Sequence, residues 1–247
     1  MMTWLLKNRN PIGWKKWRKI ALIVPVVIAS TAYGRDVDQC SMFHNAQPDD
    51  SRIFVDPRGN LSPEFRFSRR YLTPNDFPEP TPAKVETFAL HLETGLPVEN
   101  YRSTPPQEYE HFQILLQYVP YVKPLNRMFI NLGFLLWEEA PDEIVLHLLD
   151  NIADGYIGVE APNTARTSLS NVDIALKFDQ KTGTFGEAFL VCKQIGSVPN
   201  PSCSLYLNEQ GFILDIYFNR KELTRVDRIE FLARRFVTCS ITKGSEQ

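Results

Sequence analysis

Residues 203–218 read CSLYLNEQGFILDIYF, and this stretch decides the fold. Gln210 and Gly211 separate two runs in which apolar residues alternate with polar ones, so the stretch predicts an antiparallel β-hairpin with strands over 203–208 and 212–219. A strand with one strongly apolar face needs a covering element, because apolar surface is unfavourable in water. That face consists of Phe212, Leu214, Ile216 and Phe218.

Two more strands are expected before this hairpin, over residues 171–178 and 185–194, and they complete a four-stranded meander. An amphipathic helix expected over residues 224–237 can cover the apolar face. Its apolar stripe consists of Val226, Ile229, Leu232, Ala233 and Phe236. The opposite side of the helix carries basic residues that complement the helix dipole, so no anion site is needed to explain them. These residues are Arg225, Arg228, Arg234 and Arg235.

The preceding part of the chain has a mixed pattern. Strands are expected over residues 85–95 and 128–137. Helices are expected over residues 107–119 and 142–154, and Gly155 would end the second helix. Strands together with helices predict the α+β class, with antiparallel sheets and covering helices.

Residues 89–93 match residues 175–179 in residue type, which favours two similar modules in tandem. Chance is the alternative, because any two exposed strands share an alternating pattern. The predicted division is an α+β module over residues 84–165 and a second one over residues 166–247. An extended, proline-rich arm is expected before them, over residues 35–83.

The arm is poor in regular pattern. Two short strands are expected in it, over residues 53–55 and 65–67, around a turn at 57–60. Residues 72–82 contain several prolines and indicate an extended, polyproline-like connector. We therefore expect the arm to pack on the part of the chain that follows it.

The amino-terminal segment, residues 1–34, carries six basic residues and no acidic ones. Residues 20–34 are uncharged but shorter than the roughly 20 residues that a membrane span needs. The segment therefore indicates an export signal or a short retained anchor, and a buried core helix is the remaining alternative. Small residues at 30–32 suit cleavage, whereas the long basic region before the apolar run suits an anchor. Both export readings place residues 35–247 outside the cytoplasm.

All four cysteines follow the apolar run, and an even count in an exported chain favours disulfides. Cys192 and Cys203 flank a loop between two expected strands, so they can close the base of a hairpin. Cys40 with Cys239 would then tie together the ends of the exported part. Four unpaired thiols are the alternative. A zinc site is disfavoured because the sequence has no CxxC motif.

The sequence contains no motif for catalysis, metal binding or cofactor binding, since GxSxG, GxGxxG, Walker A and HExxH patterns are all missing. Residues 150–155 are only faintly similar to a calcium loop, because Ile152 and Ala161 stand where oxygen ligands are required. Paired acids are assigned to solvated faces. Structural or surface roles are expected for His44, His91, His111 and His147. We therefore predict no catalytic residue, no metal ligand and no cofactor.

The composition, 43% hydrophobic and 23% charged, is that of a folded globular protein and excludes disordered, collagen-like and coiled-coil chains. Residues 35–247 carry 21 basic and 29 acidic residues, a net charge of −8. Such an acidic body argues against a nucleic-acid partner, which would require a basic face. It favours a basic protein partner instead.

The carboxyl-terminal pattern resembles periplasmic immunity proteins encoded beside type VI secretion effectors, particularly lipase-type effectors. It consists of a strand that begins at Cys203, a turn at Gly211, a second alternating strand and a closing amphipathic helix, over about the last 70 residues. The chain departs from the family where an aromatic residue is expected before the helix and Thr224-Arg225 stands instead. The resemblance implies an export signal and two α+β modules, and it brings no catalytic residues.

The first functional hypothesis is an exported periplasmic binding protein, not an enzyme. It would neutralise a secreted toxic effector, expected to be basic, by occluding the effector's active site. Residues 20–34 would contact the inner membrane if they are retained. The alternative is a structural or assembly component of the bacterial envelope or of a secretion apparatus, whereas a hydrolase lacks any recognisable constellation. Contact residues are not predicted, and core filling is favoured over a binding role for the aromatic candidates Phe77, Tyr101, Tyr118 and Tyr121.

Overall fold

The computed structural model describes residues 40, 43, 49–73, 82–98, 110–121, 147–160, 171–179 and 184–241, and for residues 184–187 the backbone alone. Its strands are β1 (Asp50–Arg52), β2 (Phe65–Phe67), β3 (Glu86–His91), β4 (His111–Tyr118), β5 (Leu148–Ala153), β6 (Tyr156–Val159), β7 (Val172–Asp179), β8 (Thr184–Lys193), β9 (Ser202–Glu209) and β10 (Phe212–Asn219). Its helical elements are the 3₁₀ turns η2 (Arg69–Tyr71) and η4 (Arg220–Arg225) and the α-helix α3 (Val226–Ser240).

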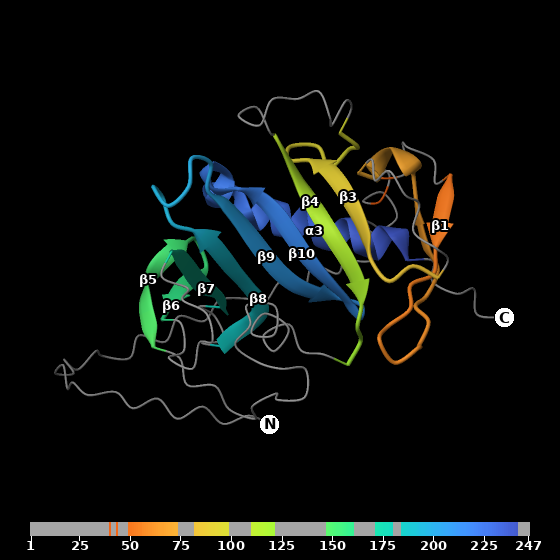
Figure 1. Cartoon of the computed structure of the whole chain (residues 1–247), viewed down its shortest axis with the longest axis horizontal. Coiled ribbons are helices and arrows are strands. Elements are labelled where there is room, and N and C mark those ends of the chain that lie inside the picture. Colours follow the sequence, from red (N-terminus) through yellow and green to blue (C-terminus); the bar gives the residue numbers. More distant parts are fainter. Residues whose placement is uncertain are drawn as a thin grey trace, which may run out of the picture. The chain divides into compact units, whose positions relative to one another are not determined.

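Eight of the described strands form one antiparallel sheet, in the order β3-β4-β10-β9-β8-β7-β6-β5 (Figure 1). Strands β7 to β10 are a meander, and β4 pairs with β10 although the two are far apart in sequence. The broad α+β class is confirmed, but the described part is mostly β-structure and α3 is the α-helix that covers it. The sheet takes strands from both expected modules, and the boundary at residue 165 falls between β6 and β7. The division into modules stays a prediction.

The last third of the chain follows the sequence prediction closely. The four expected strands are present as β7 to β10, and the helix expected over 224–237 is present as α3, with η4 before it. In the turn between β9 and β10, Gln210 and Gly211 have φ values of 50° and 84°, as a tight hairpin turn requires. A Cβ at Gly211 would lie 3.2 Å from Pro120 and Tyr118, so this turn also packs closely on the end of β4.

Two predicted helices are wrong. The structure has strand β4 where a helix was expected over 107–119, and it has β5 where a helix was expected over 142–154. Strand β4 is paired on both edges, with β3 and with β10, so sheet pairing overrides the helix-start signal at residues 104–107, which resemble a capping box. Gly155, expected to end a helix, has a φ of 69° in the two-residue turn that joins β5 to β6.

In the arm, the strand expected over 65–67 is present as β2. The strand expected over 53–55 is displaced, because β1 ends at Arg52 and the next residues form isolated bridges: Phe54 pairs with Ala83 and Val55 with Leu61. The strand expected over 85–95 is confirmed as β3, although it is shorter.

Three further expectations lie outside the described residues. They concern the strand over 128–137, most of the proline-rich connector over 72–82, and the amino-terminal segment 1–34. Within the described ranges, no helix has the length and apolar character that crossing a bilayer requires.

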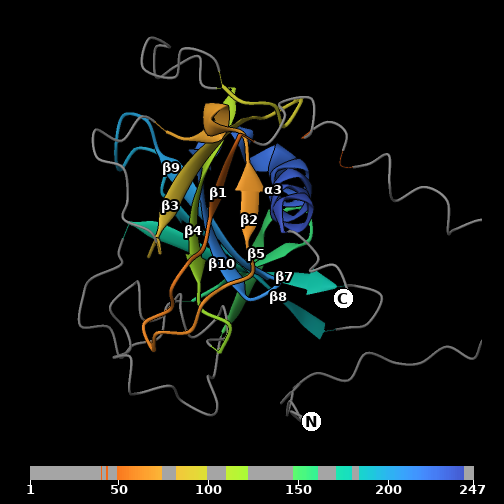
Figure 2. The same cartoon turned by 90° about the vertical axis from the view of Figure 1, so that its right-hand side faces the viewer.

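The main core lies between one face of the sheet and two covering elements, α3 and the arm with β1 and β2 (Figure 2). The Phe65 ring of β2 lies 5.8 Å from the Phe236 ring of α3 and 5.7 Å from the Phe212 ring of β10, measured between centroids. Burying a side chain of this size contributes roughly 1.5–3 kcal/mol. The arm is therefore part of the core. The apolar stripe predicted for the last helix is fully buried there, at Val226, Ile229, Leu232, Ala233 and Phe236.

A disulfide joins Cys40, at the start of the described residues, to Cys239 near the end of α3, with Cα atoms 5.6 Å apart. This is the pairing that the sequence suggested for the two ends of the exported part. It fixes the beginning of the arm to the helix that the arm packs against.

Candidate functional site

The loop between β8 and β9 projects from the sheet and is closed by a second disulfide (Figure 1). Cys192 and Cys203 lie opposite each other on the two strands, with Cα atoms 4.1 Å apart, and this is again the suggested pairing. Ile195, just beyond the bridge, keeps 81% of its surface exposed, more than any other large apolar residue in the described part of the chain. Such a side chain becomes shielded from water only when a partner covers it.

Polar contacts fix the base of the loop. The backbone N–H of Arg220 donates to the carbonyl of Pro201 at 2.9 Å, and its guanidinium donates to the carbonyl of Lys193 at 2.6 Å. One residue therefore holds both ends of the loop. The Arg220 guanidinium also pairs with Asp173 at 2.6 Å. The side-chain amide of Gln194 donates to the same carboxylate at 3.1 Å.

Contacts within the loop restrict it further. The backbone N–H and the hydroxyl of Ser197 both donate to the carbonyl of Gln194, at 3.1 and 2.6 Å. Gly196 has a φ of 87°, a conformation that glycine adopts readily, and Pro199 and Pro201 have fixed φ angles. A loop that is ordered before it binds loses less conformational entropy on binding.

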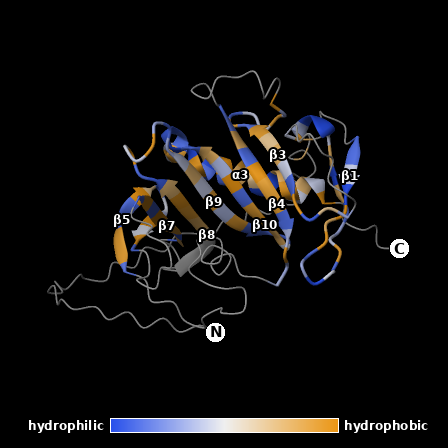
Figure 3. Ribbon diagram, viewed as in Figure 1, coloured by the Kyte–Doolittle hydropathy of each residue, from blue (hydrophilic) through white to orange (hydrophobic). Residues whose placement is uncertain are grey.

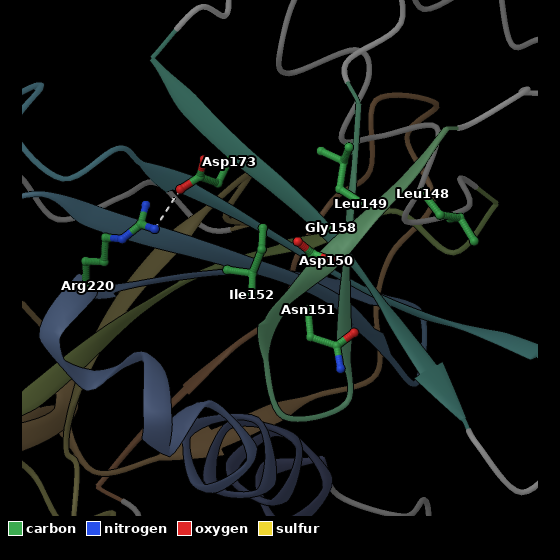
Figure 4. A pocket seen from close by; sticks show the side chains of 8 residues that line it. All are labelled: Leu148, Leu149, Asp150, Asn151, Ile152, Gly158, Asp173 and Arg220. Carbon is green, nitrogen blue, oxygen red and sulfur yellow. Dashed lines mark ion pairs between the residues drawn. The ribbon is translucent and has the colours of Figure 1, made fainter.

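A pocket of about 770 Å³ lies beside the base of this loop (Figure 4). The Asp173–Arg220 pair belongs to the pocket wall and also holds the loop, so the two features are continuous. We call residues 193–202 together with the pocket lining the loop–pocket site. The lining includes Leu149, Asp150, Ile152, Gly158, Asp173 and Arg220.

Strand β5 contributes most of the pocket lining and is the last strand of the sheet in the described part. Its register with β6 shifts on both sides of Asn151. At this irregularity the backbone of β5 comes close to β6. Gly158 permits the close approach, because a Cβ there would lie 2.7 Å from the carbonyl oxygen of Asp150. Irregular edges of this kind disfavour strand addition. The strand is therefore more suited to contact a partner through its side chains. Leu148 and Leu149 are 49% and 57% exposed, and Figure 3 shows β5 as largely hydrophobic.

The loop–pocket site has the composition of a protein-docking surface. Exposed apolar side chains, Ile195 on the loop and Leu148 and Leu149 on β5, accompany a polar, hydrogen-bonded base, so the site offers both the apolar and the polar surface that protein interfaces use. Both nearby cysteines are in a disulfide, so neither offers a thiolate. Among the described residues, no group of three or more histidines, cysteines and acids is placed to hold a metal ion.

A second cluster of charged residues lies beneath α3 and has a structural role. The buried Glu230 carboxylate accepts hydrogen bonds from the Tyr156 hydroxyl at 3.0 Å, Lys177 Nζ at 2.5 Å and Arg234 Nε at 3.0 Å. Burial alone would raise the pKa of Glu230, but its bonds and ion pairs with Lys177 and Arg234 outweigh burial and lower it. Burial and the neighbouring carboxylate raise the pKa of Tyr156, which keeps its hydroxyl a donor. The cluster therefore joins α3 to β6 and β7.

Two of the four histidines lie on paired strands of the sheet. His91 and His111 lie opposite each other on β3 and β4. Burial, and then the charge of His91, lowers the pKa of His111. His147 directly precedes β5, and its carbonyl accepts a hydrogen bond from the backbone N–H of Glu160 at 2.8 Å. His44 lies outside the described residues.

Two of the four aromatic candidates, Phe77 and Tyr101, lie outside the described residues. Tyr118 packs on a core phenylalanine of β10, with ring centroids 5.2 Å apart. The guanidinium of Arg58 stacks on Tyr121, 3.7 Å from the ring centroid. Both described tyrosines thus make contacts within the chain, and neither belongs to the loop–pocket site.

The loop itself is predicted from the sequence, but its most exposed apolar residue, Ile195, is not. The signal that points to Ile195 is an isolated large apolar residue in a glycine- and proline-containing loop between two cysteines, because such a residue has no strand partner to pack on. Asp150 escapes prediction for another reason: a helix expected over residues 142–154 gives no ground to expect Asp150 in the same pocket as Asp173.

The fold is similar to that of Smlt3025, an immunity protein of the Stenotrophomonas maltophilia type IV secretion system, with a TM-score of 0.53. The two chains are 14% identical, and the match covers 79% of this chain and 94% of the other. FrpD, an iron-regulated outer membrane lipoprotein of Neisseria meningitidis, matches over the same shares with 10% identity and a TM-score of 0.39. No family model and no curated protein matches the sequence.

The chain therefore has a fold that resembles a bacterial secretion-system immunity protein. The system named for Smlt3025 is type IV, whereas the carboxyl-terminal resemblance concerned type VI effectors. The two disulfides indicate an extracytoplasmic location, because such bonds persist in oxidising compartments.

Proposed function

We propose that this chain is an immunity-type binding protein that acts in the periplasm and neutralises a secreted toxic effector by covering the effector's active site. The observation that carries the proposal is the fold shared with Smlt3025 over 79% of the chain. The disulfide-closed loop supports it, because a rigid loop with an exposed apolar side chain suits insertion into a cleft of another protein.

The proposal includes the finer features expected from the sequence. The partner is an effector of a bacterial secretion system, of type IV or type VI, and the acidic body of this chain favours a basic one. The chain acts by binding, without catalysis, metal or cofactor. Residues 1–34 direct it across the inner membrane, and residues 20–34 anchor it there if they are retained.

The proposal is tested by expressing the product of the neighbouring gene in the periplasm of a host, with and without this chain. We expect the wild type to restore growth and to co-purify with that product. Ile195→Asp should lose protection and weaken the complex by about 30-fold or more, because it brings a charge into an apolar contact. Leu61→Asp is the matched control and should protect like the wild type, since Leu61 is an apolar residue of the arm, 59% exposed.

Toxicity that the wild type does not relieve, together with no complex on purification, would contradict the proposal. A structural or assembly component of the envelope would behave differently: it would co-purify with membrane proteins of the apparatus and leave the toxicity unchanged. Equal protection by Ile195→Asp and the wild type would show that Ile195 is not part of the contact.

A further inference from the structure

The pocket beside the loop carries an acidic group that the described part of the fold does not neutralise. Asp173 pairs with Arg220 at 2.6 Å and accepts a hydrogen bond from Gln194. Asp150 is exposed to solvent, and its carboxylate makes neither an ion pair nor a side-chain hydrogen bond with any described residue. The lining therefore holds two carboxylates and one guanidinium, which leaves it with a negative charge.

The rest of the lining suits an aliphatic chain. Leu149 and Ile152 supply apolar surface from β5, and Gly158 presents backbone without a side chain. Figure 4 shows the Asp150 carboxylate, Ile152 and the Asp173–Arg220 pair arranged around the same space. Apolar walls with one unneutralised carboxylate match the two parts of a long basic side chain, its aliphatic stem and its charged head.

We propose that this pocket receives an arginine or lysine side chain of the protein partner. The stem of that side chain packs on Leu149 and Ile152, and its charge pairs with Asp150. The inference rests on the proposed function, since the effector carries the cation. The pocket volume, about 770 Å³, exceeds that of one side chain and leaves room for the partner backbone that presents it.

This pairing assigns different tasks to the two parts of the loop–pocket site. Ile195 supplies an apolar anchor that many partners could accept. The pocket supplies selectivity, because a partner with a neutral residue there would bury Asp150 without a counter-charge. The net charge of −8 over residues 35–247 also attracts a cationic partner at long range and opposes a second copy of this chain.

The first test compares Asp150→Asn with Asp154→Asn. The first substitution removes the charge and keeps the shape, whereas the second removes an exposed acid from the adjacent turn, outside the pocket lining. Affinity for the neighbouring gene product is measured by calorimetry at about 0.15 M salt. We expect Asp150→Asn to weaken binding about tenfold or more and Asp154→Asn to change it by less than about twofold.

The second test needs no protein partner. Butylguanidinium and neutral butylurea, which have nearly the same shape, are titrated into the full chain while amide chemical shifts are recorded. We expect saturable shifts at residues 149–152 and at Gly158 with butylguanidinium in the wild type. Butylurea should cause none, and Asp150→Asn should abolish them.

The two tests separate failure of the inference from failure of the proposed function. If the gene product binds the wild type and Asp150→Asn equally and butylguanidinium shifts no amide, the pocket assignment is overturned while the function stands. If the product does not bind at all, the function fails, and the titration alone then decides whether the pocket recognises a cation. A dimer of this chain that Asp150→Asn dissociates would mean that a second copy fills the pocket, and it too would overturn the inference.

Discussion

The hydroxyl of Tyr71 lies inside the aromatic core without a hydrogen-bond partner among the described residues. Its ring lies 5.0 Å from Phe236 of α3, and burial raises the pKa of Tyr71 to about 12. A buried, unpaired polar group costs about 1–3 kcal/mol. We therefore expect Tyr71→Phe to raise the free energy of unfolding by about 1 kcal/mol, measured by urea denaturation.

Tyr156→Phe is the matched control for this prediction. The Tyr156 hydroxyl donates to the Glu230 carboxylate at 3.0 Å, and a hydrogen bond to a charged group contributes about 1.5–3 kcal/mol. The same chemical change should therefore destabilise the protein at this position. Loss of stability in both variants would show that the Tyr71 hydroxyl has a partner.

At the scale of elements, the attachment of α3 depends on Glu230. Because its folded-state pKa is lowered from the ordinary value of 4.5, the ionised carboxylate stabilises the fold. This contribution is fully present above about pH 4.5 and is lost as the pH falls through the folded-state pKa. We expect Glu230→Gln to lower the free energy of unfolding by about 2 kcal/mol at pH 7.

The measurement is the free energy of unfolding from pH 7 to pH 3 for the wild type and for Glu230→Gln. Other acids with lowered pKa values, such as Asp50, contribute the same slope to both proteins, so the difference isolates Glu230. The two curves should converge as the pH falls. A difference that stays constant with pH would mean that Glu230 acts through packing alone.

The pairing of β9 with β10 could be predicted because every signal for it is local. The apolar alternation over 212–218 and the turn at Gln210-Gly211 specify both the strands and their register. The partner of β10 on its other side is β4, from a distant part of the chain. No local pattern specifies that pairing, and the capping-box-like residues 104–107 before β4 favour a helix instead.

The hairpin of β5 and β6 was predicted wrongly as a helix, although the sequence contains a signal for the hairpin. Asp154-Gly155 is among the strongest signals for a two-residue hairpin turn, and β-prone residues follow it at 156–159. The irregular register of β5 removes strict alternation, so its leucines and Ile152 fall at helical spacing. Weighing the turn above the spacing would have predicted the hairpin.

The candidate site also has one part that local sequence predicts, the loop, and one part that it does not, the pocket. The loop and its flanking cysteines were visible in the sequence, because they are neighbours along the chain. The pocket depends on sheet order, which brings Asp173 of β7, Asp150 of β5 and Arg220 at the start of η4 into the lining of one pocket. Residues brought together by such long-range pairing leave no common sequence pattern.

At the scale of the whole described fold, we expect one disulfide to act mainly on stability and the other mainly on affinity for the partner. The bridge from Cys40 to Cys239 spans 199 residues and joins the arm to α3, whereas that from Cys192 to Cys203 spans 11 and closes the loop. On a chain-entropy model these spans correspond to about 5 and about 3 kcal/mol of stabilisation. Only the short bridge closes the loop of the loop–pocket site.

We therefore expect the paired substitutions Cys40→Ser/Cys239→Ser to lose more stability in urea denaturation than Cys192→Ser/Cys203→Ser. The order should reverse for affinity toward the protein partner, because only the second variant loosens the loop that presents Ile195. Both affinities are measured by calorimetry at a temperature at which circular dichroism shows each variant folded, with the oxidised wild type as the reference. Equal losses of affinity would contradict this prediction. They would indicate that the arm, or the helix it is tied to, also contacts the partner.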